Sequence, residues 1–472
     1  MAIIKFGTDG FRGIIDQDFN DYNVRLAAYA YGIYLQEKNL ATRGVVVGFD
    51  CRYKSMDFAQ NAALVLGNMG LQVYLFSQAV PTPVVSYNIL AHKLGGGIVI
   101  TASHNPSQWN GFKIKTHQGA GAGLEITDRI EELCQKLTLP FLPLSLNELK
   151  QKGLVRSADS FKELYYQQLA SLVDLDLIKK QTWRICTNPM HGAGIDCLPA
   201  ILRNGRIKVE EINDEIDDTF GGIPPEPVDK NLASQQNLMK ELPYDVGLAL
   251  DGDADRLGVI SEEGRFLTPP QVFSLLAYYM YKHRNLQGGL VRTVNASVML
   301  EKICGYFRKD LYTVPVGFKY IAEHMLNGTA DMGGEESGSY GYAMHMPERD
   351  GILSGLLLLE FMAKEKKKPQ ELLNELYQIS DQWYYQREDI YFDAERNIDI
   401  KDALQKLCPA SILGQTVRKL DRTDGLKLTL NDDSWLLLRV SGTEPLIRIY
   451  AESLSPVQTA ALLSYGKQSL NL

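Results

Sequence analysis

Three aspartates at alternate positions form the segment of the sequence best suited to hold a metal ion. Asp251, Asp253 and Asp255 follow a predicted buried strand at 246–250, and strand character resumes at 257–260. Unpaired carboxylates at this spacing repel one another, and the small residues between them let the backbone bring the side chains together. A hard divalent cation would relieve that repulsion. The pattern therefore predicts a Mg²⁺ site, and a solvated acidic turn is the alternative.

An EF-hand calcium loop is the specific competing interpretation of this segment. Asp251, Asp253, Asp255 and Glu262 fall at the first, third, fifth and twelfth positions of such a loop. The sixth position, where the EF-hand turn requires glycine, is Arg256, and the flanking segments have the pattern of strands rather than helices. We therefore reject the EF-hand.

A serine that could act as a nucleophile or carry a phosphoryl group follows another predicted strand. Ser103 and His104 come just after the buried run 98–100, and ligands of α/β sheets gather outside the carboxyl ends of strands. An Asn-Pro pair favours a turn directly after them, and Lys113 is close enough along the chain to reach it. The G-x-S-x-G pattern of a nucleophile elbow is absent. An ordinary polar loop is the alternative.

The C-terminal part of the chain carries a segment suited to a phosphate group. Hydroxyls and unhindered backbone N–H groups lie between two arginines, whose planar guanidinium groups match phosphate oxygens. The Lys-Ser/Thr ending of a nucleotide P-loop is absent, and a plain β-turn with two surface arginines is the alternative. The residues concerned are Arg439, Ser441, Gly442, Thr443 and Arg448.

Three other segments carry weaker signals. The N-terminal run 6–13 places small residues around Arg12, and a glycine-rich loop at the end of a strand is the alternative. Glu335 and Ser337 offer acceptors for hydroxyl groups, with a plain turn as the alternative. The glycines of 119–123 follow no strand in dinucleotide-binding register, so we predict a mobile loop there.

The elements that must position these residues alternate between short β-branched runs and longer helical patterns. This alternation predicts βαβ units with buried parallel strands. Strands are predicted at 45–47, 71–76 and 98–100, and connecting segments at 139–143 and 364–369. The last hundred residues carry more strand signal, at 435–440 and 446–450, which predicts a smaller α+β domain.

Length and composition limit the class of protein. The 472 residues suggest three or four domains, and 45% hydrophobic with 22% charged residues is ordinary for a soluble protein. The net charge of −8 disfavours non-specific nucleic-acid binding. The six cysteines show no C-x-x-C spacing, which predicts free thiols in a reducing compartment. Without a signal-peptide core or a membrane-spanning apolar run, we expect a soluble, cytoplasmic protein.

Taken together, the motifs resemble those of the α-D-phosphohexomutase superfamily. T-A-S-H-N-P, D-G-D-A-D-R, G-E-E-S-G and R-V-S-G-T-E-P-L-I-R occur in this order, and the resemblance extends from Gly7 to Glu452. It implies four domains around one central cleft: three α/β domains with mixed sheets and a C-terminal α+β domain of the TATA-box-binding-protein-like kind. We expect the domains at 1–148, 149–257, 258–369 and 370–472.

The resemblance also implies a role for each candidate residue. Ser103 would carry the exchangeable phosphoryl group and, with Asp251, Asp253 and Asp255, would hold Mg²⁺. Glu335 and Ser337 would bind sugar hydroxyls. The remaining implied roles are catalytic for His104, Lys113 and Arg12, phosphoryl-contacting for Arg256, sugar-orienting for Lys319, and phosphate-clamping for Arg439, Ser441, Gly442, Thr443 and Arg448.

The activity implied is that of a Mg²⁺-dependent phosphoglucomutase, which would interconvert the sugar phosphates glucose 1-phosphate and glucose 6-phosphate through a phosphoserine and a hexose 1,6-bisphosphate. Mannose phosphate would be a second substrate. Ser339 stands where many relatives carry His, and Glu336 is the second acidic residue, as in glucose-preferring relatives. The opening F-G-T-D-G-F-R-G, however, resembles phosphoglucosamine mutases, which are the alternative. A sugar-phosphate phosphatase and a non-catalytic sensor are alternatives of other classes. We expect a monomer or homodimer with no nucleic-acid or membrane partner.

Overall fold

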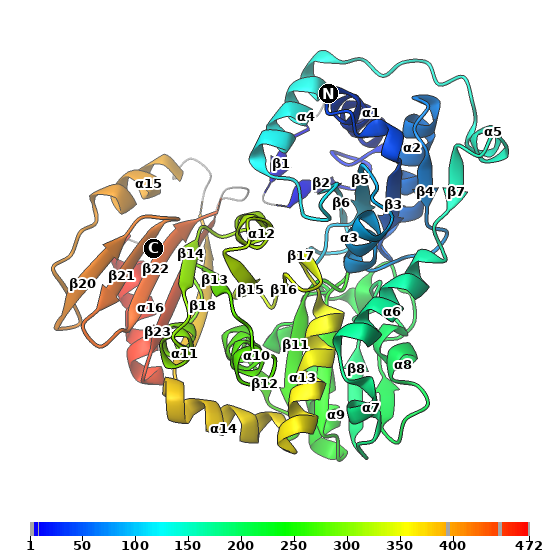
Figure 1. Ribbon diagram of the computed structural model, residues 1–472. Helices are drawn as coiled ribbons and strands as arrows, with labels where there is room; N and C mark the ends of the chain where they lie inside the picture. The colour runs from blue at the N-terminus through cyan, green and yellow to red at the C-terminus, as the bar shows by residue number, and fades with distance from the viewer. Residues whose placement is uncertain (1–3, 8, 393–396, 442–445, 471–472) are drawn as a thin grey trace.

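Four β-sheets follow one another along the chain, each with its own helices (Figure 1). The computed structural model describes residues 4–7, 9–392, 397–441 and 446–470. The first three sheets mix parallel and antiparallel strands, and the fourth is antiparallel throughout. This arrangement confirms the prediction of three α/β domains followed by a smaller α+β domain.

The first sheet positions the serine loop, residues 101–109, which runs from the end of β5 to the first residue of β6. Its strand order is β1-β2-β6-β5-β3-β4-β7, in which β5, β3, β4 and β7 are parallel to one another and β6 is antiparallel to β5. The strands are β1 (Phe6–Gly7), β2 (Gly10–Ile14), β3 (Val45–Phe49), β4 (Val73–Leu75), β5 (Gly96–Ile100), β6 (Trp109–Thr116) and β7 (Val155–Ser157). The helices are α1 (Asp21–Glu37), η1 (Ala41–Arg43), α2 (Ser55–Asn68), α3 (Thr82–Ala91), α4 (Leu124–Lys136) and α5 (Leu146–Gln151). Every residue of β3 and β5 is buried, as the continuous apolar runs predicted.

The second sheet positions the acidic loop, which is the turn between the antiparallel strands β10 and β11. Its order is β12-β11-β10-β8-β9. The strands are β8 (Arg184–Asn188), β9 (Lys208–Glu211), β10 (Val246–Leu250), β11 (Leu257–Ser261) and β12 (Phe266–Leu267). The helices are α6 (Phe161–Leu172), α7 (Leu175–Lys179), α8 (Cys197–Leu202), η2 (Phe220–Gly222), η3 (Asp229–Asn231) and α9 (Ala233–Glu241).

The third sheet positions the Glu335 loop between β15 and β16. Its order is β14-β13-β15-β16-β17. The strands are β13 (Gly289–Thr293), β14 (Leu311–Val314), β15 (Ala330–Gly334), β16 (Tyr340–Tyr342) and β17 (Met346–Arg349). The helices are α10 (Pro269–His283), α11 (Met299–Phe307), α12 (Phe318–Leu326), α13 (Gly351–Glu365) and α14 (Pro369–Ser380). Helix α13 packs against β10 and β11 and so joins the second and third domains.

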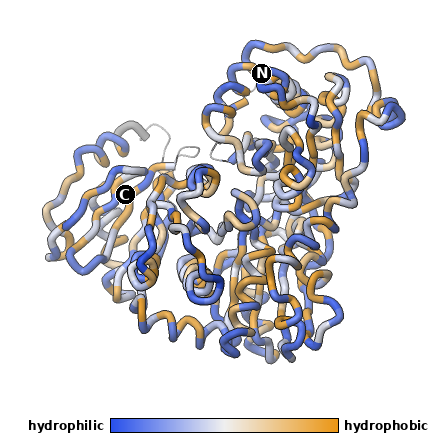
Figure 2. The backbone as a smooth tube through the Cα atoms, viewed as in Figure 1, coloured by the Kyte–Doolittle hydropathy of each residue, from blue (hydrophilic) through white to orange (hydrophobic). Residues whose placement is uncertain are grey.

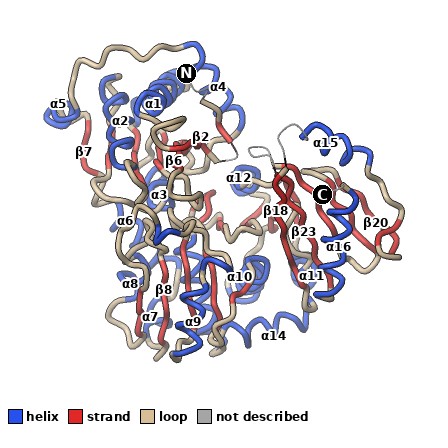
Figure 3. The backbone as a smooth tube through the Cα atoms, turned by 180° about the vertical axis from the view of Figure 1, so that it is seen from behind, coloured by secondary structure: helices blue, strands red, loops and turns tan. Residues whose placement is uncertain are grey.

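The C-terminal sheet, of order β18-β23-β22-β21-β20-β19, has its own hydrophobic core. The strands are β18 (Tyr384–Tyr391), β19 (Ser411–Ile412), β20 (Gln415–Asp421), β21 (Leu426–Leu430), β22 (Trp435–Val440) and β23 (Leu446–Ser453), and the helices are α15 (Asn397–Lys406) and α16 (Pro456–Ser469). Figure 3 shows α14 leading from the third domain into this one. A small apolar cluster around Val298 and Trp435 packs the two domains together.

Burial separates the molecule into two main cores. One cluster of buried residues runs through the first three domains, and a separate one fills the fourth. Hydrophobic colour is concentrated in the interior of the molecule in Figure 2, whereas the outlying α5 is hydrophilic. No described helix is both long and apolar enough to cross a membrane. All six cysteines are free, as predicted, and five of them are buried.

Two strands pair across the expected domain limits. Strand β7 lies beyond residue 148 but pairs with β4, and β12 lies beyond residue 257 but pairs with β11. We propose that the first two domains extend to these strands. The predicted connection at 139–143 lies between α4 and α5. Of the connection predicted at 364–369, residues 366–368 join α13 to α14, whereas 364–365 end α13 and 369 begins α14.

Candidate active site

The serine loop and the acidic loop meet at the boundary of the first and second domains. Ser103, just after β5, donates a hydrogen bond from Oγ to Oδ2 of Asp251 at 2.7 Å. Ser103 is 1% exposed and Asp251 is fully buried. The Ser103 backbone is left-handed, with φ of 54°, a conformation that residues with a side chain rarely adopt. Two residues that the sequence proposed separately are thus brought into direct contact.

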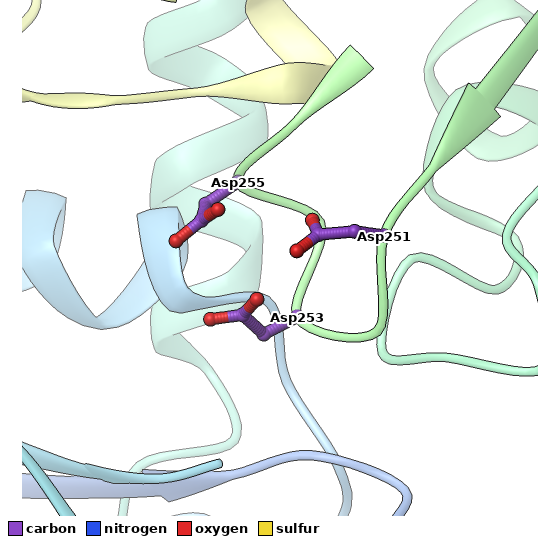
Figure 4. Close-up of side chains that lie close together, drawn as sticks. All are labelled: Asp251, Asp253 and Asp255. Carbon is purple, nitrogen blue, oxygen red and sulfur yellow. The ribbon is translucent and has the colours of Figure 1, made fainter. Parts of the chain in front are cut away.

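The three aspartates converge as predicted. One carboxylate oxygen from each of Asp251, Asp253 and Asp255 lies within 4.8 Å of the others, and all three side chains are buried (Figure 4). Oδ1 of Asp253 and Oδ1 of Asp255 have no hydrogen-bond partner among the described residues. Buried carboxylate oxygens without partners are costly, and hard oxygen donors are what Mg²⁺ prefers. The donor set therefore fits a magnesium ion.

Lys113 is a buried cation that contacts two of the three aspartates. On β6, its ammonium lies 2.9 Å from Oδ2 of Asp253, 3.2 Å from Oδ2 of Asp255 and 2.8 Å from Oδ2 of Asp9. Burial opposes its charge, but the three carboxylates raise the pKa of Lys113 above its usual value. Burial likewise opposes ionisation of Asp253, yet Lys113 and hydrogen bonds hold its pKa below the usual value. Burial and the other two aspartates raise the pKa of Asp251.

Three basic residues lie at the serine loop and the acidic loop. Nδ1 of His104 lies 3.4 Å from Oγ of Ser103, and burial, together with the charges of Arg256 and Arg12, holds the pKa of His104 well below its usual value. Arg12, on β2, donates to Oδ1 of Asn105 at 2.6 Å. Arg256 donates its backbone N–H to Oδ1 of Asp251 at 3.0 Å. His104, Arg12 and Arg256 therefore all lie at the serine loop or the acidic loop.

The predicted sugar-binding residues lie together on the third domain. Glu335 is 8% exposed and accepts the backbone N–H of Gly317 at 3.0 Å, two residues before Lys319 on α12. The Ser337 and Ser339 hydroxyls are 3.3 Å apart. The buried carboxyl of Glu335 also lies 3.9 Å from the guanidinium of Arg349, which in turn contacts Asp255. The two loops of the second and third domains are linked through this arginine.

The predicted phosphate grip is on the C-terminal domain. Arg439 on β22 and Arg448 on β23 are directly paired across the two strands. Nε of Arg439 donates to Oδ2 of Asp424 at 2.8 Å, and that carboxylate also accepts the backbone N–H of Val316 at 2.9 Å. The backbone N–H of Ser441 donates to the Leu446 carbonyl. Gly442 and Thr443 lie outside the described residues. The grip is therefore tied to the segment that carries Lys319.

Sequence reasoning missed several charged residues that join the domains at the site. Asp9 contacts Lys113 and Arg349, and Nε of Arg349 donates to Oδ2 of Asp255 at 2.7 Å. Lys115 lies 2.5 Å from Glu348. The one available signal was the charged run Glu-Arg-Asp at 348–350, which ends β17 and precedes the glycine that begins α13.

The ion pair between Lys115 and Glu348 predicts a stability effect. Nζ of Lys115 and Oε2 of Glu348 are 2.5 Å apart, both side chains are at most 2% exposed, and they join the first and third domains. Glu348→Gln leaves a buried ammonium without its counter-charge, so we expect a loss of about 3–5 kcal/mol in the free energy of unfolding, measured by urea denaturation.

The matched control for this prediction is the exposed pair of Lys54 and Asp16, whose atoms are 2.7 Å apart with side chains 31% and 58% exposed. Asp16→Asn should cost less than about 1 kcal/mol, because water screens an exposed pair. Equal urea midpoints for the two variants would contradict a stabilising role for the buried pair.

Comparison with known proteins agrees with the four-domain architecture over most of the chain. Four models of the phosphoglucomutase/phosphomannomutase family match: alpha/beta/alpha domain I at residues 4–140, domain II at 163–264, domain III at 268–379 and the C-terminal domain at 396–464. Together they cover most of the sequence, in the order of the four sheets.

Individual relatives carry different sugar names. A phosphoglucomutase/phosphomannomutase of Thermococcus kodakarensis is 33% identical over 463 residues, covering 98% of this chain and 97% of its own. A phosphoglucosamine/phosphogalactosamine mutase of Sulfurisphaera tokodaii is 30% identical over 454 residues, covering 95% of each. A crystal structure from Thermus Thermophilus, described as that of a candidate phosphomannomutase, is 34% identical with a TM-score of 0.87 and full coverage of both chains. This chain therefore belongs to the phosphoglucomutase/phosphomannomutase family, and it is a phosphoryl-transferring isomerase.

Proposed function

We propose that this chain interconverts glucose 1-phosphate and glucose 6-phosphate, with a phosphoryl group carried on Ser103. The observation that carries the proposal is the hydrogen bond from Ser103 Oγ to Asp251. It puts a hydroxyl that can hold a phosphoryl group beside three converging carboxylates. A serine turned into a metal-binding cluster suits phosphoryl transfer, in which charge spreads over the transferring oxygens.

The proposed reaction has two half-steps at one serine. In the first, the bond between phosphorus and Ser103 Oγ breaks as the free hydroxyl of glucose 1-phosphate attacks, which gives glucose 1,6-bisphosphate. In the second, Oγ takes the phosphoryl group from the C1 oxygen, which leaves glucose 6-phosphate. The bisphosphate is thus both the intermediate and the primer of unphosphorylated enzyme. The proton of the attacking hydroxyl must pass to a base, and we propose His104, whose Nδ1 lies 3.4 Å from Ser103 Oγ and whose lowered pKa leaves the ring neutral. Lys113 stays protonated because the surrounding carboxylates raise its pKa, so we propose it as the group that donates a proton or contacts the phosphate.

Charge neutralisation is the other requirement of the transfer. We propose that Asp251, Asp253, Asp255 and the phosphoserine hold Mg²⁺, which would offset charge on the transferring oxygens. Arg256 and Arg12 would contact the same phosphoryl group, because both lie at the serine and acidic loops. Lys113 would balance the acidic cluster through its contacts with Asp253 and Asp255.

The substrate would be held from the other two domains. We propose that Glu335, Ser337 and Lys319 bind the sugar hydroxyls and that the grip on the C-terminal domain binds the phosphate that is not transferred. The grip residues are Arg439, Ser441, Gly442, Thr443 and Arg448. The separate core of the C-terminal domain supports a closing motion over the substrate, which would exclude water from the phosphoserine.

Glucose is the proposed sugar because of two positions in the loop that follows β15. Ser339 stands where the resemblance places a histidine in many mannose and glucosamine relatives, and its hydroxyl lies near that of Ser337. Glu336 is the second acidic residue of the loop, and its Oε1 lies 3.2 Å from Nδ2 of Asn295 and 3.5 Å from Arg387 of the C-terminal domain. Glucosamine phosphate is the alternative, which the name of the Sulfurisphaera relative supports.

The experiment is ³¹P NMR of the purified protein with Mg²⁺. Separate samples contain glucose 1-phosphate, mannose 1-phosphate or glucosamine 1-phosphate, each with a trace of its 1,6-bisphosphate. We expect conversion to the 6-phosphate without free phosphate, fastest for glucose. A faster glucosamine sample would replace the proposed sugar. Accumulating inorganic phosphate would indicate a phosphatase, and an unchanged spectrum in every sample would contradict the proposed activity.

A further inference from the structure

We propose that Arg52, a buried residue outside the predicted site, is a positioning residue that holds the Ser103 loop at the acidic cluster, with Phe220 of the second domain packed on its guanidinium. The inference rests on the proposed function in one respect only, since its kinetic effect presupposes that Ser103 carries the phosphoryl group. Its structural content, that Arg52 fixes the loop, stands independently.

Every N–H group of the Arg52 side chain has an acceptor. Nε donates to Oδ2 of Asp50 at 3.0 Å. Four backbone carbonyls of the serine loop accept the other four N–H groups, at 2.5 to 3.0 Å; they belong to Ser103, Asn105, Pro106 and Trp109. The Arg52 and Asp50 side chains are both 0% exposed. Only the planar fork of arginine offers five donors in fixed directions, so no other side chain could satisfy this set of carbonyls.

The same arginine closes a ring of hydrogen bonds around the Ser103 backbone. Asp50 also accepts the Thr101 hydroxyl at 2.6 Å, and that hydroxyl accepts the Ser103 backbone N–H at 2.8 Å. The N–H of Ser103 is thus held through Thr101 and its carbonyl through Arg52. A serine with φ of 54° persists only where its surroundings fix it, and this ring does so from both sides.

The second domain completes the arrangement. The Phe220 ring centre lies 4.8 Å from Cζ of Arg52, and Phe220 is 1% exposed. A Cβ added to Gly252 of the acidic loop would lie 2.6 Å from the Ser103 carbonyl oxygen, so the two backbones are in close contact. The Ser103 carbonyl therefore contacts both Arg52 and the acidic loop. Arg52 sets how far Ser103 extends toward Asp251.

Arg52→Lys tests the inference, because lysine keeps the charge beside Asp50 but cannot reach four carbonyls. We expect kcat to fall by about 100-fold, the size of effect expected when a reacting group is misplaced by about 1 Å. KM should change by less than about threefold, because the proposed sugar and phosphate contacts are untouched. Hydrogen exchange of the amides in 101–109 should become faster. Phosphorylation of Ser103 by glucose 1,6-bisphosphate, followed by intact mass, should slow in parallel with kcat.

Two further variants keep the test decisive. Phe220→Leu retains an apolar side chain but removes the aromatic face, and we expect kcat to fall by about 3–10-fold with faster exchange of the same amides. If Arg52→Lys does not fold, the Phe220→Leu variant tests the positioning role in its place. Arg284→Lys is the matched control: Arg284 also donates to a backbone carbonyl, that of Leu172, and to a carboxylate, Glu360, and these two residues lie outside the site. It should leave kcat and the 101–109 exchange unchanged.

The outcomes separate the two proposals. If the wild type is active, and both Arg52→Lys and Phe220→Leu keep its kcat and its hydrogen exchange in 101–109, the positioning role is overturned. Faster exchange of 101–109 in Arg52→Lys, with no mutase activity in the wild type on any sugar, would uphold the positioning role and reject the proposed function. A fall in kcat that Arg284→Lys reproduces would also overturn the inference, because loss of arginine hydrogen bonds outside the site would then have the same effect.

Discussion

Replacing Ser103 by alanine is expected to abolish mutase turnover, with a fall in kcat on the order of 10⁴-fold or more. Alanine has no oxygen to accept the phosphoryl group, so neither half-step can occur. The fold should survive, because the hydroxyl donates one hydrogen bond, to Asp251, and a typical hydrogen bond contributes about 0.5–1.5 kcal/mol. Turnover of glucose 1-phosphate, measured by ³¹P NMR, gives the loss directly.

A covalent readout makes the Ser103 test independent of the sugar. Wild-type protein incubated with glucose 1,6-bisphosphate should gain one phosphoryl group by intact mass, whereas Ser103→Ala should gain none. Ser86→Ala is the matched control, since Ser86 is buried on α3 and its hydroxyl has no hydrogen-bond partner among the described residues. It should keep full activity. Steady turnover in Ser103→Ala close to that of the wild type would remove Ser103 from the mechanism.

The sequence predicted the local structure of the site well because its signals are local. The buried apolar runs at 45–47, 98–100 and 246–250 became β3, β5 and β10. Three aspartates separated by single residues can converge within one turn, and they do. The turn at Asn105-Pro106 and the paired arginines of β22 and β23 also follow from short segments whose geometry depends little on the rest of the chain.

The charges that join the domains could not be predicted, because no short segment contains both partners. Asp9 and Arg349 are 340 positions apart, and their contact depends on how the first and third domains pack. Arg52 looks like an ordinary polar residue after a strand, and only the folded loop brings four carbonyls to it. The short strand β7 was missed for a related reason, since a three-residue segment carries too little pattern to assign it to a sheet.

Asp253→Asn is the second change expected to have a large effect, because it removes one of the three buried carboxylates. Asparagine keeps the shape and the bond from the Thr82 hydroxyl, which donates to Oδ2 at 2.6 Å, but it loses the charge. Losing an outer-shell partner of a metal lowers its affinity by about 10–100-fold, and we expect the loss of a direct ligand to lower Mg²⁺ affinity by at least as much. Titration calorimetry with MgCl₂ measures that affinity without turnover. The Mg²⁺ concentration needed for half-maximal activity should rise in proportion.

The matched control for the metal test is Asp159→Asn. Asp159 is also a hydrogen-bonded carboxylate, which accepts from the Ser77 backbone and hydroxyl and from the Ser157 hydroxyl, but it lies outside the acidic cluster. Asp159→Asn should leave Mg²⁺ affinity unchanged. Treatment with EDTA should abolish the activity of this variant and of the wild type alike. Equal Mg²⁺ affinity in Asp253→Asn and the wild type would show that the cluster does not hold the metal. The buried, unpartnered oxygens of Asp253 and Asp255 would then need another cation, and Lys113, which contacts Oδ2 of both, is one candidate.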